Sequence, residues 1–411
     1  MIPEHIETLI VGGGQAGLTM SHMLSQRECP HLVLERSRIA ERWRSERWDG
    51  LRFQFPNWSV SLPDFPFPHA DPDGFATSAE IVDYLDAYAR TVKPPIRCGV
   101  AVTRLSGDET GKRFIITTSA GPLTADRVVV ATGPYQRPII PAALAKEIDL
   151  FQLHASAYKR PDQLPAGAVL IVGSGASGAQ IAEELARAGR QVFLSVGRHK
   201  RMPRRYRGRD LIWWLREMGL EQMPVEERGP ASTLPLITGA YGGHTIDFRE
   251  FAAQGMMLVG RLKSASGGIL SFAADLHESL AYGEAAYNAF LERADAFVEQ
   301  KRMALPVEPQ ASMTSPELQY VVDPVRRLDS RAEGISSVIW ATGYTFDFSW
   351  IYLPVLGTQG EPRHRYGVAE VPGLYFLGLP WLSKMNSSFL SGVADDATRL
   401  ADHIRTARLR S

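Results

Sequence analysis

Two short, largely apolar runs lie in the same sequence setting. Residues 8–11 and 169–172 each lead directly into a glycine-rich turn, and a helical pattern of apolar positions follows each turn. A short continuous apolar run beside a turn is typical of a strand buried on both faces. The order of strand, glycine turn and helix therefore predicts two α/β units that begin in the same way.

Hydrophobic spacing predicts further elements around these two units. Predicted helices cover residues 79–90, 210–218, 282–300 and 391–408, and predicted strands cover residues 99–105, 113–118, 127–130, 336–340 and 373–380. Residues 43–67 are rich in Trp, Phe and Pro without a regular period, and residues 160–167 are predicted to be a Pro/Gly linker. Residues 208–330 as a whole match no pattern.

Both glycine turns carry the spacing Gly-x-Gly-x-x-Gly. The glycines are Gly12, Gly14 and Gly17 in the first turn, and Gly173, Gly175 and Gly178 in the second. Between a strand and a helix, such glycines allow a tight turn and a close approach of backbone to pyrophosphate, which the helix N-terminus then holds. The intervening Gln15, Ala16 and Ser177 are expected to help bind the dinucleotides. Two such motifs predict two bound dinucleotides.

The residue that closes the second strand of each unit distinguishes the two dinucleotides. Glu35 follows the first motif by about 20 residues, where a carboxylate accepts hydrogen bonds from ribose hydroxyls of FAD or NAD, and Arg36 is next to it. At the equivalent place after the second motif stands Ser195, with Arg198 shortly beyond. A missing carboxylate beside a guanidinium favours the 2′-phosphate of NADPH over NADH. An ordinary solvated Arg198 remains the alternative.

A second motif, Ala-Thr-Gly, is also duplicated. Its residues are Ala131, Thr132 and Gly133 in the first copy, and Ala341, Thr342 and Gly343 in the second. Each copy ends a predicted strand and is expected, with Val102, to line the dinucleotides. The predicted fold class is α/β with two Rossmann-like dinucleotide-binding domains, the NADPH domain inserted into the FAD domain. Residues 1–155 and 335–411 form the expected FAD domain, and residues 156–334 the NADPH domain with a substrate-side insertion.

Composition narrows the possible partners. The chain of 411 residues has 45 basic and 45 acidic residues and a pI near 7.2, so neither nucleic acid nor an anionic membrane is expected as a partner. The basic run 199–209 is either a phosphate-facing loop, a solvated loop or, less in keeping with the rest, a nucleic-acid patch. Cys29 and Cys98 form no CxxC motif, which disfavours disulfide chemistry and fits a reducing compartment. With no room for a signal peptide and no long apolar run, we expect a cytoplasmic protein; no metal-ligand cluster is found.

Longer strings carry a family resemblance. They are GGGQAG, Glu35 followed by Trp43 and Arg44, DFPFP at 64–68, ATGPYQRPIIP at 131–141, HASAYKRP at 154–161, GSGASG, and GVADDATRLADHI at 392–404. With these strings the chain resembles the class B flavoprotein monooxygenases, which include the flavin-containing monooxygenases and the plant YUCCA-type enzymes. The resemblance places Trp43, Arg44 and Ser388 at the flavin.

Some positions depart from the family pattern. Ile148 and Leu150 stand where the family fingerprint has Phe and Gly, so only its second half, from His154 to Tyr158, is retained. Gln54 aligns with an Asn near the flavin of flavin-containing monooxygenases, and it becomes the candidate catalytic residue; its alternative role is packing in the aromatic loop. His154 is interpreted as a residue that orients the linker rather than as a proton donor.

The resemblance implies an FAD-dependent, NADPH-using monooxygenase. NADPH would reduce the flavin, O₂ would form a C4a-hydroperoxyflavin, and one oxygen atom would pass to a small organic substrate at nitrogen, sulfur or electron-rich carbon. The alternatives are an NAD(P)H-dependent flavin reductase acting on a quinone or other acceptor, and a redox sensor. The sequence leaves the substrate open. It also leaves a homodimer possible, since the Trp213-Trp214 and Met256-Met257 pairs suit an interface as well as a core.

Overall fold

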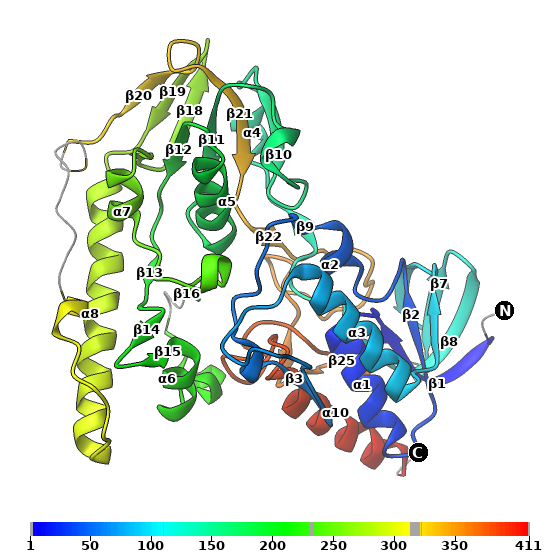
Figure 1. Cartoon of the computed structure of the whole chain (residues 1–411). Coiled ribbons are helices and arrows are strands. Elements are labelled where there is room, and N and C mark those ends of the chain that lie inside the picture. The colour runs from blue at the N-terminus through cyan, green and yellow to red at the C-terminus, as the bar shows by residue number, and fades with distance from the viewer. Residues whose placement is uncertain (1–2, 110, 230–233, 313–320, 322, 410–411) are drawn as a thin grey trace.

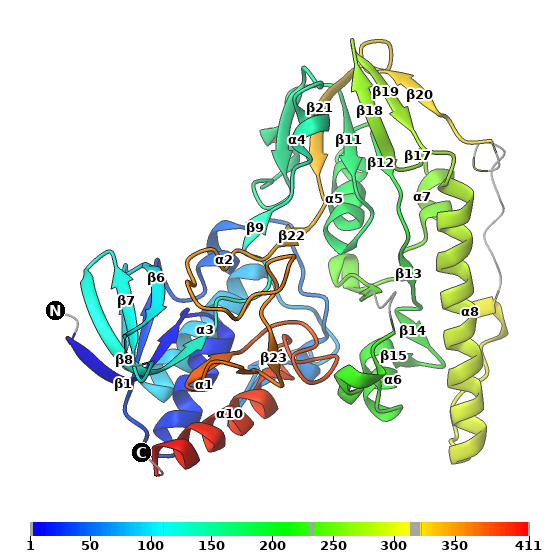
Figure 2. The ribbon, with the colours of Figure 1, turned by 180° about the vertical axis from the view of Figure 1, so that it is seen from behind.

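The computed structural model describes residues 3–109, 111–229, 234–312, 321 and 323–409. Its two main sheets belong to two units that stand apart and meet along the middle of the molecule (Figure 1). We call the part around the nine-stranded sheet the first unit, and the part around the five-stranded sheet the second unit. Both ends of the chain lie in the first unit, as the view from behind also shows (Figure 2).

The first unit is built on parallel strands with antiparallel additions. Its strands are β1 (His5–Val11), β2 (His31–Glu35), β5 (Ile96–Cys98), β6 (Val102–Gly107), β7 (Phe114–Thr118), β8 (Gly121–Val130), β23 (His364–Arg365), β24 (Val368–Ala369) and β25 (Leu374–Phe376). Strands β25, β8, β1, β2 and β5 pair in parallel in that order. Its helices are α1 (Gln15–Ser25), α2 (Glu41–Ser45), α3 (Ser78–Val92) and α10 (Val393–Arg408), and α10 packs beside α1. The short strands β3 (Ser61–Leu62) and β4 (Phe65–Pro66) form a hairpin.

The second unit is built on a wholly parallel sheet. Its strand order is β10 (Phe151–His154), β21 (Ile335–Trp340), β11 (Ala168–Val172), β12 (Val192–Ser195) and β17 (Met257–Val259). All five residues of β11 are buried, as expected for a strand covered on both faces. The helices here are α4 (Ala142–Ala145), α5 (Ala176–Arg187), α6 (Leu211–Glu217), α7 (Phe248–Ala253) and α8 (Leu276–Lys301). A separate sheet contains β18 (Leu262–Ser266), β19 (Ile269–Phe272) and β20 (Arg327–Asp329).

The chain crosses between the units twice, through β9 (Arg137–Pro138) and β22 (Tyr344–Thr345), which pair with each other. The expected boundaries at residues 155/156 and 334/335 do not follow the sheets. Strand β10 pairs with β21, and β21 pairs with β11, so both belong to the second unit. The boundaries were misplaced because linker composition and motif positions do not report which strands pair. A mixed α/β fold with large parallel sheets is confirmed.

The described part of residues 208–330, which match no sequence pattern, contributes both helices and strands to the second unit. Helix α6 packs against the long α8 in one cluster that contains the fully buried Trp214. Small strands before and within this region are β13 (Lys200–Arg201), β14 (Arg205–Tyr206), β15 (Arg209–Asp210) and β16 (Pro235–Leu236). Trp214 and Met256 are both buried, so each of the two residue pairs contributes to the core.

No helix within the described residues is both long and apolar enough to cross a membrane. The same part of the chain contains no group of three or more His, Cys, Asp or Glu side chains placed to hold a metal ion. The cysteines are free, with Cys29 buried and Cys98 exposed.

Candidate functional site

A cavity of about 1090 Å³ lies between the two units, and residues of both line it. Most predicted site residues line this cavity. They are Gly12, Gly14, Gln15, Ala16, Glu35, Arg36, Trp43, Gln54, Val102, Ala131, Thr132, Gly133, Gly175, Ser177, Arg198, Ala341, Gly343 and Ser388. Six others are not among the lining residues: Gly17, Arg44, Gly173, Gly178, Ser195 and Thr342. The two glycine turns therefore face one shared space.

The first glycine turn is held by close backbone contacts. Gly12 has a φ of +116°, and a Cβ there would lie 2.5 Å from the carbonyl oxygen of Ala131. A Cβ at Gly17 would lie 1.8 Å from the carbonyl oxygen of Gly12. Gly17 is thus required for packing α1 against the turn, which explains why it does not itself line the cavity.

The second turn repeats this geometry in detail. Gly173 has a φ of +109° with its Cβ position 2.5 Å from the carbonyl oxygen of Ala341, and a Cβ at Gly178 would lie 1.9 Å from the carbonyl oxygen of Gly173. Ala131 and Ala341 are therefore equivalent, each abutting the first glycine of one turn. Each Ala-Thr-Gly motif thus begins at the backbone that leaves no room for a side chain at the first glycine of its turn.

The middle glycines differ from the packing glycines. Gly14 and Gly175 are the N-caps of α1 and α5, and neither helix start has a side-chain cap. A Cβ at Gly14 or Gly175 would meet no protein atom within 4 Å. Uncapped N–H groups at a helix start that face open space form an anion site. These two positions fit the pyrophosphates of two dinucleotides.

The middle glycines and the packing glycines should respond differently to substitution by alanine. Gly175→Ala should fold normally, because its φ of −71° suits alanine, yet should raise the Kd of the dinucleotide on this turn by about 10–100-fold. The added methyl group would occupy the space through which the pyrophosphate approaches the backbone, a loss of roughly 1.4–2.8 kcal/mol. Gly178→Ala should instead lower the thermal midpoint, because its Cβ has no space. Nucleotide titration and thermal unfolding of both variants check this; equal nucleotide affinity for wild type and Gly175→Ala would contradict it.

Glu35 is ordered at the end of β2 by backbone donors. Its carboxylate accepts from the N–H of Gly13 at 2.7 Å and from the N–H of Ser37 at 2.9 Å. Each oxygen keeps a further lone pair, and the side chain lines the cavity next to Arg36. Glu35 therefore stands where a ribose of the first dinucleotide would donate to it.

At the equivalent place in the second unit, Ser195 points elsewhere. Its hydroxyl donates to the carbonyl of Gly260 at 3.0 Å and accepts from the N–H of Leu262, and the residue is buried. Arg198 does line the cavity, and its Nη2 lies 3.0 Å from Glu278 in an exposed ion pair. The two residues therefore have different surroundings. The Ser195 hydroxyl stabilises the turn after β17, and Arg198 lines the cavity.

An aromatic wall lines the cavity beside the first glycine turn. Trp43 and Phe53 are in edge contact with centroids 5.5 Å apart, and Phe53 lies 5.2 Å from Phe55. Gln54 lies between the two phenylalanines, half-buried and lining the cavity. Arg44 pairs with Asp86 at 2.5 Å, which joins α2 to α3.

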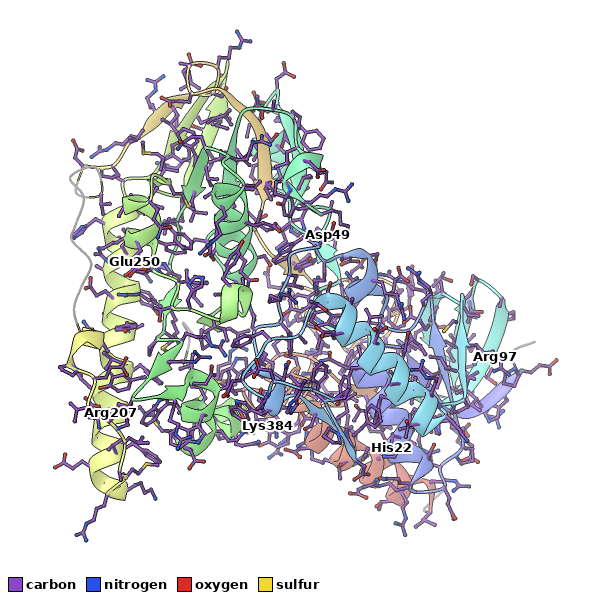
Figure 3. All side chains as sticks on the ribbon, in the orientation of Figure 1. His22, Asp49, Arg97, Arg207, Glu250 and Lys384 are labelled. Atoms are coloured by element: carbon purple, nitrogen blue, oxygen red, sulfur yellow. The ribbon has the colours of Figure 1, made fainter. Side chains whose placement is uncertain are left out.

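The C-terminal segment completes this side of the cavity. The Nε2 of Gln15 donates to the carbonyl of Ser388 at 2.7 Å, joining the first glycine turn to the segment before α10. Lys384, which precedes Ser388 in this segment, lies where the lower end of the second unit meets the first (Figure 3). The N–H of Met385 donates to the carbonyl of Met223 at 2.9 Å, so both units form the wall at this point.

Comparison with known proteins identifies the family. A model of the pyridine nucleotide-disulphide oxidoreductases matches residues 9–221. The uncharacterized oxidoreductase CzcO-like of Geobacillus kaustophilus is 33% identical over 98% of this chain and 99% of its own length. The probable indole-3-pyruvate monooxygenase YUCCA9 of Arabidopsis thaliana is 32% identical over 43% of this chain and 44% of its own. The chain belongs to the pyridine nucleotide-disulphide oxidoreductase family, and its similarity to the YUCCA-type monooxygenase covers less than half of it.

Solved structures show the same fold. A flavin-containing monooxygenase from Stenotrophomonas maltophilia has a TM-score of 0.66 at 18% identity, covering 98% of this chain and 99% of that one. The bacillithiol disulfide reductase of Staphylococcus aureus has a TM-score of 0.63 at 13% identity with the same coverage. The family and the relative that matches along the whole chain are oxidoreductases, and the solved structures share the fold of this chain.

In the retained half of the fingerprint, His154 contacts the second crossing. His154 Nε2 donates to the carbonyl of Gly343 at 3.0 Å, while its Nδ1 accepts from the N–H of Ser156. Burial lowers the pKa of His154 below its ordinary value, so the ring is neutral at pH 7. Thr342 donates to the carbonyl of Ile139 in the other crossing. The contact with Gly343 supports the interpretation that His154 orients the linker.

Sequence reasoning missed Arg204, which reaches the aromatic wall from the second unit. Its Nη1 donates to the backbone carbonyl of Gln54 at 2.7 Å, and its Nη2 lies 2.7 Å from the carboxylate of Asp210. The guanidinium covers the ring of Phe75 and the residue is 1% exposed. Its position in a basic run, next to other arginines, gave no signal that this arginine is buried.

Proposed function

We propose that the chain is an FAD-dependent, NADPH-using monooxygenase that transfers one oxygen atom from O₂ to a small organic substrate. FAD would lie on the first glycine turn and NADPH on the second, so that each unit is a Rossmann-like dinucleotide-binding domain. The observation that supports this best is the pair of open helix starts at Gly14 and Gly175, which face one cavity. When bound, the flavin supplies the redox and oxygen chemistry.

The chain's own residues would bind, orient and exclude water. Glu35 would accept from the FAD ribose, the wall of Trp43, Phe53 and Phe55 would cover the flavin, and the amide of Gln54 would present a polar group at that wall. Water exclusion by such a wall strengthens every polar contact inside it. The two free cysteines and the lack of a CxxC motif fit a cytoplasmic enzyme without thiol–disulfide chemistry.

The competing function is a flavin reductase without oxygenation, a reaction that the same fold accommodates. Rapid mixing of the NADPH-reduced enzyme with O₂ distinguishes the two. A monooxygenase shows a long-lived absorbing species between reduced and oxidised flavin; a reductase returns directly to oxidised flavin. Direct return, together with turnover of a quinone, would establish the reductase and overturn the proposal.

The first cofactor gives a simple prediction. The purified protein should be yellow with tightly bound FAD, and Gly14→Ala should lose most of it while remaining folded, because its φ of −87° is compatible with alanine. Absorbance of the purified protein and of its heat-released cofactor measures this. A wild-type protein that stays colourless after incubation with FAD would contradict the assignment.

The hydride donor gives a second prediction. Arg198→Ala should raise KM for NADPH by about 10-fold or more and leave KM for NADH nearly unchanged, since a charge-assisted bond to the 2′-phosphate is worth roughly 1.5–3 kcal/mol. Glu278→Gln is the matched control. Its exposed ion pair with Arg198 is worth at most about 1 kcal/mol, so removing it should leave NADPH binding equal or tighter. Equal effects of Arg198→Ala on both nucleotides would show that Arg198 does not read the phosphate.

A further inference from the structure

A second hollow, of about 380 Å³, lies beside the shared cavity and is also walled by both units. Its lining includes Trp48, Gly50 and Arg52 of the first unit, and Gln180, Glu184 and Tyr241 of the second. Three of these residues, Trp48, Arg52 and Gln180, line the larger cavity as well. Asp49, in the same segment as Trp48, lies where the two units meet (Figure 3). We call this space the side hollow.

The half-buried carboxylate of Glu184 has no cationic partner within the described part of the chain. Its Oε2 accepts from the hydroxyl of Tyr158 at 2.8 Å, and no Lys, Arg or His side chain among those residues forms an ion pair with it. Burial raises the pKa of Glu184, the hydrogen bond from Tyr158 lowers it, and the nearby Asp49 carboxylate raises it again. A carboxylate in such surroundings would be stabilised by a bound cation.

Two acceptor oxygens on α5 are available to a ligand in the side hollow. A Cβ at Gly50 would lie 2.1 Å from Oε1 of Glu184, so this oxygen faces the first unit where both residues line the hollow. Gln180 is one helical turn earlier and on the same face of α5. It is 4% exposed, and its Oε1 has no hydrogen-bond partner among the described residues. A ligand with several N–H donors, such as an ammonium, would satisfy both oxygens.

The cation of the side hollow is Arg52, which is exposed. A backbone bridge joins Arg52 to Thr77. Hydrogen bonds with Thr77, and to a smaller extent the charge of Arg52, lower the pKa of Glu80 at the start of α3. The guanidinium therefore lies toward α3 and stands apart from Glu184 on α5. The side hollow thus presents a positive group and a negative group at separate places in its lining.

The remaining lining contains two aromatic rings. Trp48 is buried. Tyr241 is 53% exposed and has a φ of +53°, and the adjacent Gly242 also has a positive φ. The guanidinium of Arg187 lies over the Tyr241 ring at 3.9 Å and pairs with the carboxylate of Glu183 at 2.9 Å, which holds the ring in place. The two rings offer apolar surface to the aliphatic part of a ligand.

We propose that the side hollow is a binding site for a small zwitterion of the size of a free amino acid. The ammonium of the ligand would donate to Oε1 of Glu184 and Oε1 of Gln180, its carboxylate would accept from Arg52, and its aliphatic part would lie against Trp48 and Tyr241. A ligand with only one of the two charges would leave one end of the site unpaired. Because both units line the side hollow, the bound zwitterion would also join them. The proposal does not depend on the oxygen-transfer reaction.

The experiment is calorimetric titration of the purified full chain, with the cofactor it retains, using three probes of the same carbon skeleton. The probes are L-norleucine, hexanoate, which lacks the ammonium, and 1-aminopentane, which lacks the carboxylate. Norleucine should bind at least about 10-fold more tightly than either of the others, since each of them loses one charge-assisted contact. Saturating norleucine should also raise the thermal midpoint, because it binds the folded state. Equal affinity for all three probes, or no binding of norleucine, would overturn the proposal.

Variants assign the two ends of the site. Glu184→Gln, whose amide oxygen can still accept from the hydroxyl of Tyr158, should remove the preference for norleucine over hexanoate. Arg52→Met should instead remove the preference over 1-aminopentane. Glu183→Gln is the matched control: Glu183 is the adjacent residue of α5 and is buried, but it does not line the side hollow, so both preferences should remain.

The outcomes separate the side hollow from the larger cavity. Preferences that are lost in Arg198→Ala and kept in Glu184→Gln would place norleucine in the larger cavity and overturn the proposal. Equal losses in Glu184→Gln and Glu183→Gln would also overturn it, because they would reflect a general disturbance of α5. The wild-type series of probes decides the charge requirement whether or not a variant folds.

Discussion

Arg204→Met is expected to produce the largest loss of stability of any single change considered and to uncouple NADPH oxidation from product formation. Arg204 and Asp210 form an ion pair in which both residues are buried, with side chains 2% and 8% exposed. Removing one member of such a pair leaves an unpaired buried charge and costs about 3–5 kcal/mol. The loss of the hydrogen bond to the Gln54 carbonyl should also loosen the aromatic wall. Thermal unfolding and the ratio of product to NADPH consumed measure the two effects separately.

The chain offers a closely matched control in Arg201 and Asp247. This pair is also buried, with an N–O distance of 2.6 Å, and Arg201 covers the ring of Tyr287 much as Arg204 covers Phe75. Both aspartates cap a helix by accepting from a backbone N–H, Asp210 for α6 and Asp247 for α7. Arg201→Met should therefore lower stability similarly without changing the coupling. Uncoupling of equal size in both variants would mean that it follows from instability rather than from the contact with Gln54.

The parts of the fold that the sequence predicted are set by local physical requirements. Gly12 and Gly173 need positive φ, and Gly17 and Gly178 leave no room for a Cβ, so any chain with this turn must carry glycine there. Helix α3 was predicted within two residues of its observed ends, and Thr77 with Glu80 forms a capping box at its start. Such signals lie within a few residues of one another and are visible without knowing the fold.

The parts that escaped prediction depend on contacts between distant segments. Arg204 and Gln54 are brought together only when the two units assemble, and no spacing rule connects them. Ser195 occupies the expected place at the end of β12, but its hydroxyl is bound by Gly260 and Leu262 of a later turn. The strands β10 and β21 join the second sheet through pairing that linker composition does not encode. Predictions about individual side chains at the cavity therefore need the tertiary structure more than the glycine turns do.

Gln54→Ala is expected to leave flavin reduction by NADPH nearly unchanged and to increase the release of hydrogen peroxide. Gln54 is the polar residue between Phe53 and Phe55 in the wall, its carbonyl is fixed by Arg204, and the cavity lies beside it. Its amide is proposed to hydrogen-bond the reacting oxygen or the NADP⁺ that covers the flavin. Removing it would lose about 0.5–1.5 kcal/mol of hydrogen bonding and admit water, so that part of the bound oxygen leaves as peroxide instead of reaching the substrate.

Comparison with Gln54→Asn and with stability decides between this role and simple packing. Asparagine keeps the amide one methylene shorter, as in the flavin-containing monooxygenases that the motifs resemble, and should retain most of the coupling. If Gln54→Ala lowers the thermal midpoint while the ratio of product to NADPH stays at the wild-type value, Gln54 is a packing residue of the aromatic wall. Because the Arg204 bond is to the Gln54 backbone carbonyl, neither substitution removes that contact. A peroxide release that appears in Gln54→Ala at normal stability, and is reduced again in Gln54→Asn, would therefore assign the effect to the amide itself.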